Sequence, residues 1–228
     1  MTAILSAHEL HLGYGSAPVI NGLNLTLKAG EVVALLGPNG AGKTTTLLGL
    51  AGALPARQGE VRVNGRVSKA PVYRRCRRDM AFVTEERSVI SSMSVHENLR
   101  VGRCDADFAL DLFPELKALL RRKAGLLSGG EQQMLTLARA LARKPKVLLA
   151  DELSLGLAPL VVERLLQAVR AAADEGLAVL LVEQHVRKAL AKADRVYVLR
   201  HGAVAFTGTA ADAAENLQTI EELYLATA

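Results

Sequence analysis

The sequence predicts an α/β fold with a mainly parallel sheet and a small antiparallel β layer near the N-terminus. Short aliphatic runs alternate with segments of helical period, which is typical of buried parallel strands joined by helices. The N-terminal part instead alternates apolar with polar residues, as antiparallel strands with one solvent-facing side do. The 228 residues are enough for a substantial core. Because we find no internal repeat or linker, we expect one continuous domain over residues 3–228.

Three alternating segments predict the antiparallel layer: Ile4–Leu12, Leu23–Leu27 and Glu60–Val63. Asn64-Gly65 follows the third segment, and this dipeptide is a strong signal for a hairpin turn. A second hairpin is expected near the C-terminus, where His201-Gly202 separates two apolar segments.

The parallel sheet is predicted from short aliphatic runs, which are Val32–Leu36, Val147–Ala150, Ala178–Val182 and Val196–Leu199. The segments of helical period between them are Thr44–Leu54, Gln132–Ala142 and Val161–Ala173. Pro145 stops the second of these helices, and Gly176 is a good terminator for the third.

Residues 37–44 match the pattern G-x-x-x-x-G-K-[ST], between a predicted strand and a predicted helix. Glycines let the backbone N–H groups of such a loop point at phosphate oxygens, and the following helix adds its positive end. Lys43 would place a cation on the terminal phosphates, and the Thr44 hydroxyl would bind Mg²⁺. The alternative is a glycine-rich turn, which these flanks disfavour. The predicted nucleotide-binding loop comprises Gly37, Pro38, Asn39, Gly40, Ala41, Gly42, Lys43, Thr44 and Thr45.

Two acids end the predicted strand 147–150. A carboxylate at the C-terminal end of a strand suits Mg²⁺ binding, so Asp151 is assigned to the metal. Glu152 can reach the attacking water and serve as general base. His185 follows the next strand and could contact the terminal phosphate. With the nucleotide loop these residues predict a P-loop NTPase core that uses ATP and Mg²⁺, with Lys43, Glu152 and His185 as catalytic residues.

The segment Leu127–Gln133 reads LSGGEQQ and precedes a helical run. Ser128, with Glu131 three residues later, forms a capping box and marks a helix start. Gly129 and Gly130 leave the backbone of this positively polarised helix end open, which makes it a second anion-binding surface.

Composition excludes some classes of function. Aromatic residues are only 4% and Trp is absent, so recognition of nucleic acid by base stacking is poorly supported. Cys76 and Cys104 have no metal-ligand spacing and suit a reducing compartment. We find no signal peptide and no apolar run long enough to span a membrane. The net charge of +5 includes two basic clusters, 74–78 and 121–123, which favour a solvated surface over contact with acidic lipid or nucleic acid.

LSGGEQQ, together with the P-loop and the segment LLADE, resembles the ATPase domain of ABC transporters over essentially the whole chain. The resemblance implies that Tyr14 stacks on adenine and that Glu85 occupies the Gln-loop position, where it senses Mg²⁺ and the permease. It implies that 154–157 is the D-loop and His185 the switch histidine. Ser128, Gly129 and Gly130 would bind the ATP held by a second subunit. Residues 87–125 would form a short helical subdomain that meets the permease.

Several segments, among them LSGGEQQML, DELSLGLAP and LVEQHV, are similar to one of the two ATPases of branched-chain amino acid importers. That resemblance implies a heterodimer formed with ATP, separate permease subunits and, indirectly, a substrate-binding protein. It places the chain in the cytoplasm, on the inner face of the cell membrane. Glu85 stands where most of the family has Gln, and Leu153 stands where Pro is usual.

Other readings stay open. Urea and amide importers share these features, and export is a further transport option. An ABC ATPase acting on nucleic acid would usually carry two ATPase domains or a long coiled-coil insert, so no nucleic acid partner is expected. A non-hydrolysing binding module is disfavoured by intact Lys43, Asp151, Glu152 and His185.

Overall fold

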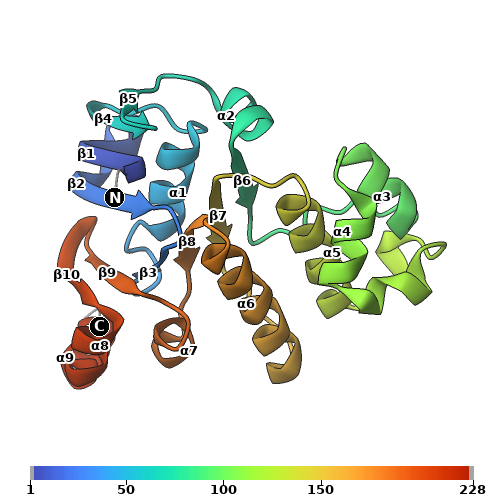
Figure 1. Cartoon of the computed structure of the whole chain (residues 1–228). Coiled ribbons are helices and arrows are strands. Elements are labelled where there is room, and N and C mark those ends of the chain that lie inside the picture. Colours follow the sequence, from blue (N-terminus) through green and yellow to red (C-terminus); the bar gives the residue numbers. More distant parts are fainter. Residues whose placement is uncertain (1–2, 226–228) are drawn as a thin grey trace.

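The computed structural model describes residues 3–225, and residues 226–228 of the predicted domain lie outside this range. The described chain forms two β-sheets with helices around them and a group of helices to one side (Figure 1). None of the described helices is long and apolar enough to cross a membrane.

The N-terminal sheet is antiparallel, with strand order β2-β1-β4-β5. Its strands are β1 (Ala3–Tyr14), β2 (Ala17–Lys28), β4 (Gln58–Val63) and β5 (Arg66–Val67). The turn Asn64-Gly65 joins β4 and β5, and both of its residues have positive φ, as the hairpin signal predicts. The alternating apolar residues of this sheet are buried, and they form one core cluster with the facing sheet and α1 (Lys43–Ala51).

The second sheet has strand order β10-β9-β3-β8-β7-β6. All pairs are parallel except the hairpin β9–β10, which turns at His201-Gly202. The strands are β3 (Val32–Leu36), β6 (Met80–Val83), β7 (Val147–Asp151), β8 (Ala178–Val182), β9 (Arg195–Arg200) and β10 (Ala203–Thr209). Every residue of β3, β7 and β8 is buried, which explains their unbroken aliphatic sequences.

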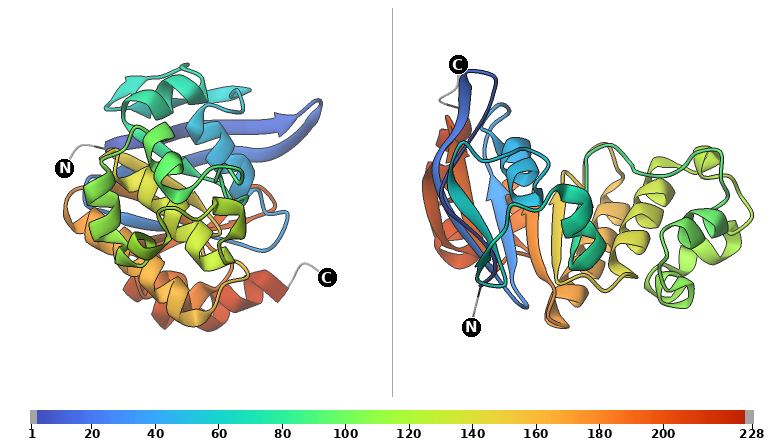
Figure 2. Two further views of the ribbon diagram at one scale, coloured as in Figure 1. Left: turned by 90° about the vertical axis from the view of Figure 1, so that its right-hand side faces the viewer. Right: turned by 90° about the horizontal axis from the view of Figure 1, so that it is seen from above.

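Five further helices accompany the sheets. Helix α2 (Val72–Arg78) precedes β6, and α6 (Pro159–Asp174) connects β7 to β8. Helix α7 (Val186–Leu190) lies between β8 and β9, and the chain ends in α8 (Ala210–Glu215) and α9 (Leu217–Leu225). Figure 1 shows α7, α8 and α9 below the sheets, and the red helices α8 and α9 lie together at the bottom of the left view of Figure 2.

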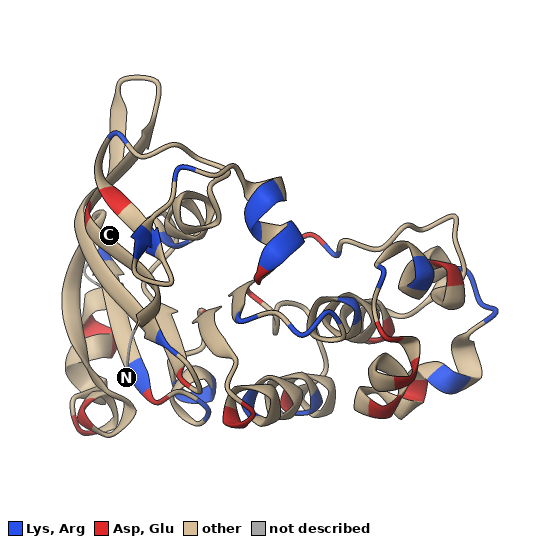
Figure 3. Ribbon diagram, turned by 45° about the horizontal axis from the view of Figure 1, so that its top comes forward, with Lys and Arg blue, Asp and Glu red and all other residues tan. Residues whose placement is uncertain are grey.

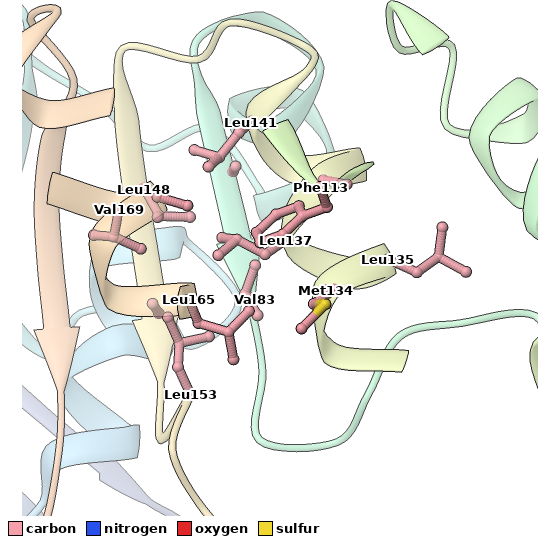
Figure 4. Packing of buried hydrophobic residues seen from close by; sticks show 14 of the residues in the cluster. Val83, Phe113, Met134, Leu135, Leu137, Leu141, Leu148, Leu153, Leu165 and Val169 are labelled. Atoms are coloured by element: carbon pink, nitrogen blue, oxygen red, sulfur yellow. The ribbon is translucent and has the colours of Figure 1, made fainter. Parts of the chain in front are cut away.

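The remaining helices lie beyond β6 and β7. They are α3 (Val95–Val101), α4 (Ala106–Leu112), the 3₁₀ helices η1 (Pro114–Leu119) and η2 (Ala124–Leu126), and α5 (Gly129–Leu141). One hydrophobic cluster connects them to the sheet and α6, with Phe113, Leu137 and Leu165 among its buried members (Figure 4). Because this packing is continuous, the position of α5 is fixed relative to the end of β7.

The predicted fold class is confirmed: a mainly parallel sheet and an antiparallel N-terminal sheet are both present. The helix expected over Thr44–Leu54 ends earlier, at Ala51, because Gly52 takes a left-handed conformation (φ 79°) and caps it. The helix expected over Gln132–Ala142 begins three residues earlier, directly after Ser128. Strand β6 and helix α2 carry no clear periodic signal, and the sequence did not predict them.

Candidate active site

The loop between β3 and α1 holds the predicted phosphate cradle. Gly37, Gly40 and Gly42 all have positive φ, which glycine adopts without strain. The first and third also have no room for a side chain: a Cβ at Gly37 would lie 2.4 Å from the Leu199 carbonyl oxygen, and one at Gly42 would lie 2.4 Å from Ile20 Cδ1. The loop is therefore packed directly against the ends of β9 and β2. Asn39 and Gly40, at its crest, are exposed.

Lys43 is the first residue of α1 and is buried. Its Nζ donates to the carbonyl oxygens of Gly37 at 2.8 Å and Pro38 at 3.1 Å, so the ammonium group is folded back into the loop. Burial lowers the pKa of Lys43, and the nearby carboxylates of Glu152 and Asp151 act in the opposite direction. A phosphate carries a negative charge and is a stronger partner for the ammonium group than these neutral carbonyls, so Lys43 can exchange them for a phosphate.

Asp151 ends β7 and is almost fully buried. Burial raises its pKa, and the nearby Glu152 and Glu85 raise it further; the hydrogen bond from the Thr44 hydroxyl and the charge of Lys43 lower it. Among the described residues, Oδ1 of Asp151 has no hydrogen-bond partner. A buried oxygen of this kind costs free energy unless a cation or another donor satisfies it.

These observations test whether the site fits Mg²⁺. No group of three or more His, Cys, Asp or Glu within residues 3–225 could hold a metal ion. Mg²⁺, however, is usually bound by one or two carboxylates together with substrate phosphates. Asp151, with its free oxygen, and the adjacent Thr44 hydroxyl fit that arrangement.

Glu152 follows β7 in a left-handed conformation, with φ of 49°, which is uncommon for a residue other than glycine. Its backbone N–H donates to the Val182 carbonyl oxygen at 3.0 Å, and its Oε1 accepts from Nε2 of Gln184 at 2.7 Å. The carboxylate is therefore held by the end of β8. Glu152 also lines a 470 Å³ cavity together with Glu85 and the α5 residues Gln132 and Gln133.

The segment after β8 contains two contacts that the sequence did not predict. Gln184 orients Glu152, as described above, and Glu183 binds the loop after it. The Glu183 carboxylate accepts from the Ser154 hydroxyl at 2.6 Å and from the Ser154 N–H at 3.2 Å. Glu183 is 1% exposed, and burial raises its pKa. His185, the predicted residue of this segment, is exposed at the start of α7.

Leu153 lies between these contacts, where the family resemblance leads us to expect proline. Its side chain is buried in the cluster that contains Val83 and Leu165 (Figure 4). The leucine therefore replaces a rigid residue with hydrophobic packing, and the loop 153–157 is anchored by Leu153 and Ser154 together.

The predicted residues do not all lie at one place. Four of them lie close enough to Asp151 to shift its pKa, and these are Thr44, Glu152, Glu85 and Lys43. Ser128, Gly129 and Gly130 begin α5 and do not line the cavity. Ser128 caps the helix, accepting from the Glu131 N–H, while Glu131 accepts from the Ser128 N–H, so the predicted capping box is confirmed. Tyr14, 51% exposed, lies at the tip of the β1–β2 hairpin.

A positive charge lies next to the start of α5. A Cβ placed on Gly129 would be 2.8 Å from a guanidinium nitrogen of Arg87, so this side chain lies against the first turn of the helix. From the sequence, Arg87 is only the first residue of the expected helical subdomain and has no binding role. Its guanidinium adds to the positive end of the helix and strengthens the predicted anion-binding surface.

The family model described as ABC transporter matches residues 20–154, which include the P-loop, the start of α5 and Asp151-Glu152. The chain belongs to the ABC transporter family. It is an ATP-binding domain of that family, whose members hydrolyse ATP.

Curated relatives of this ABC domain cover nearly its whole length. The branched-chain amino acid transport ATP-binding protein BraG of Pseudomonas aeruginosa is 40% identical over 91% of this chain and 94% of its own. The probable branched-chain amino acid transport protein LivF of Archaeoglobus fulgidus is 36% identical over 93% and 95%. The lipopolysaccharide export protein LptB of Haemophilus influenzae is 32% identical over 98% and 97%.

Solved structures support the ABC fold. An ATP-binding subunit of an ABC transporter superposes with a TM-score of 0.84 at 27% identity, covering 97% of this chain and 98% of its own. The ADP conformation of the ATP-binding cassette MJ1267 gives a TM-score of 0.89 at 23% identity over 99% of both chains.

Proposed function

We propose that this ABC ATPase powers the uptake of branched-chain amino acids, or of related small solutes, through a separate permease. The supporting observation is its similarity to BraG, at 40% identity over nearly the full length of both chains. The named export relative is less similar, at 32%, which favours import. Residues 3–228 would act as one ATPase domain, with the helices within 87–125 as a subdomain.

ATP supplies the cleavable phosphoanhydride bond, and Mg²⁺ neutralises charge on its phosphates. The loop Gly37–Thr45 would bind the phosphates, with Lys43 leaving its two backbone partners to do so. Thr44 and Asp151 would hold Mg²⁺, with Glu85 close by. Tyr14 would stack on the base. Asp151 would then lose its raised pKa, because a bound cation favours its ionised form.

Glu152 is the proposed general base. Gln184 occupies one carboxylate oxygen, so the other is left to accept the proton of the attacking water. His185 would join the site when the segment after β8 moves, and the contacts of Glu183 and Gln184 would carry that movement to Ser154 and Glu152.

A complete site is proposed to need a second ATPase subunit, which would present its own Ser128-Gly129-Gly130 equivalent to this ATP. Permease subunits would dock at the helical subdomain 87–125 and at the adjoining 240 Å³ groove between α2, β6 and α5, where Arg77, Arg139 and Arg143 lie. Figure 3 shows α2 largely in blue, because four of its seven residues are arginine. The chain would thus lie on the cytoplasmic face of the membrane, and a substrate-binding protein would act indirectly.

Reconstituted transport tests this proposal. The chain is assembled with its permease and partner ATPase in liposomes, and ATP-driven uptake of labelled leucine, urea and glutamate is compared. We expect leucine uptake that Lys43→Ala abolishes. ATP hydrolysis without uptake of leucine, or with equal uptake of urea, would contradict the amino acid assignment.

A further inference from the structure

The β1–β2 hairpin extends past the part of the molecule that packs against it. Leu12 and Ile20 are its last buried residues, and residues 14–18 at the tip are exposed. Tyr14 pairs with Ala17 across the turn Gly15-Ser16. The hydrophobic core therefore does not hold the tip in place.

The base of the hairpin, in contrast, is fixed to the phosphate loop and its helix. Leu12 lies against Gly49 of α1, where a Cβ would be 2.4 Å from Leu12 Cδ1. Ile20 lies in the same way against Gly42, which caps the start of α1. The position of the hairpin base is thus fixed relative to Lys43. Tyr14 lies two residues beyond Leu12, the last buried residue of β1.

Arg57 supplies the missing support at the tip. It lies in the loop between α1 and β4, and its backbone N–H donates to the His11 carbonyl oxygen at 2.9 Å. Its guanidinium donates to the carbonyl oxygens of Ala17 at 3.1 Å, Ser16 at 3.4 Å and Gly15. This one side chain therefore binds both turn residues, Gly15 and Ser16, and also Ala17, which pairs with Tyr14.

The neighbouring Gly13 shows how closely the guanidinium approaches the strand. A Cβ at Gly13 would lie 3.0 Å from the guanidinium carbon of Arg57 and 2.2 Å from the Ala17 carbonyl oxygen. Both strands of the tip therefore contact Arg57. An arginine that only extended into solvent would not have three backbone acceptors in one turn.

We propose that Arg57 is a positioning residue for recognition of the nucleotide base: it holds the hairpin tip so that Tyr14 stays at a fixed distance from Lys43. This inference rests on the proposed ATP site and on the stacking role of Tyr14. Because a preorganised platform does not have to be ordered on binding, Arg57 raises affinity for the base without touching the phosphates.

Binding of two ligands separates positioning from phosphate contact. Arg57→Ala is titrated with Mg-ATP and with inorganic tripolyphosphate, which has the phosphates but no base. We expect the Kd for Mg-ATP to rise about three- to tenfold and the Kd for tripolyphosphate to stay unchanged. Arg66→Ala, which removes the same charge from the exposed strand β5, is the control and should change neither.

A double variant tests whether Arg57 acts through Tyr14. If it does, Tyr14→Ala with Arg57→Ala binds Mg-ATP no more weakly than Tyr14→Ala alone. Additive losses, equal losses for both ligands, or no loss for Mg-ATP would each overturn the proposal. Failure of the ATP site itself would look different, because Lys43→Ala would then leave binding of both ligands unchanged.

Fluorescence gives a readout that does not depend on nucleotide. The chain has no Trp, so Tyr14→Trp introduces a single probe at the tip. We expect its anisotropy without ligand to fall when Arg57→Ala is added and to stay the same with Arg66→Ala. An unchanged anisotropy in the Arg57→Ala background would show that the tip is ordered without this side chain.

Discussion

At the scale of single residues, local sequence patterns were enough to identify Lys43 and the two carboxylates at the end of β7, Asp151 and Glu152. The spacing of glycines in 37–44 depends only on neighbouring residues, so the positive φ values of that loop could be predicted. Gln184 and Glu183 could not be predicted, because each contacts a residue about thirty positions earlier in the chain. Such contacts exist only after β7 and β8 pair.

Lys43→Ala is the first prediction at this scale. The variant should lose most of its affinity for Mg-ATP, because each charge-assisted bond to phosphate contributes about 1.5–3 kcal/mol. Its fold should persist, because the partners of Nζ are two carbonyl oxygens of its own loop, those of Gly37 and Pro38, so the ammonium group ties no separate element to the loop. Isothermal titration measures the affinity, and an unchanged Kd would contradict the assignment of the loop.

The Glu183 carboxyl gives a prediction about pH. Its raised pKa means that the folded state binds its proton more tightly than the unfolded state does. The free energy of unfolding contributed by this group therefore falls as pH rises from the unfolded pKa through the folded one. Glu183→Gln should remove that loss, because the amide stays neutral and can still pair with both groups of Ser154.

Urea unfolding at pH 5 and pH 7.5 measures this effect. We expect Glu183→Gln to gain stability relative to wild type on going from the lower to the higher pH. Glu163→Gln is the matched control: the Lys192 side chain lowers the pKa of Glu163 below its ordinary value, so its titration lies below pH 5 and this variant should keep the wild-type difference between pH 5 and pH 7.5. Parallel pH profiles of wild type and Glu183→Gln would contradict the account.

At the scale of elements, the strongly periodic strands and helices were predictable and their ends less so. Strands β3 and β8 match their aliphatic runs residue for residue. Helix α1 ends at Ala51, where a left-handed glycine overrides continuing apolar sequence. Helix α2 is short, and most of its side chains are arginine, which gives no apolar stripe to detect.

One of these arginines ties α2 to the rest of the molecule. Arg75 is buried, and it donates to the carbonyl oxygens of Ser68 at 2.7 Å, Ala70 at 2.8 Å and Leu50. Arg75→Ala should lower the free energy of unfolding by about 2–4 kcal/mol, because these buried acceptors lose their donor. Arg74→Ala, on the exposed face, should cost less than about 0.5 kcal/mol. Chemical denaturation that ranks the two equally would contradict this role.

At the scale of the whole molecule, the helix α1 of the P-loop packs against the N-terminal sheet, β7 and α2, whereas α5, with its predicted anion-binding start, packs against β6, α3, α4 and α6. Sequence motifs identified both surfaces but could not show that one chain leaves them apart, because that depends on how α5 packs beyond β7. Two chains that exchange these surfaces would each complete the other's site.

We therefore expect the purified chain to be mainly monomeric without nucleotide. Association costs several kcal/mol of translational and rotational freedom, and ATP that touches both surfaces would offset it by favouring the closed state. ATPase activity should be low alone and should rise with the partner ATPase and permease. Sedimentation velocity with and without Mg-ATP measures the first expectation; a stable, fully active homodimer without nucleotide would contradict it.

The most direct test of the central claim is phosphate release by Glu152→Gln compared with wild type, measured in the assembled complex at saturating Mg-ATP. The variant keeps the hydrogen bond from Gln184 as an amide oxygen acceptor but lacks the oxygen that takes the proton. We predict unchanged ATP affinity with hydrolysis reduced at least about 100-fold, the usual range for loss of a general base. Hydrolysis at the wild-type rate would show that the proton goes elsewhere and that this site does not work as described.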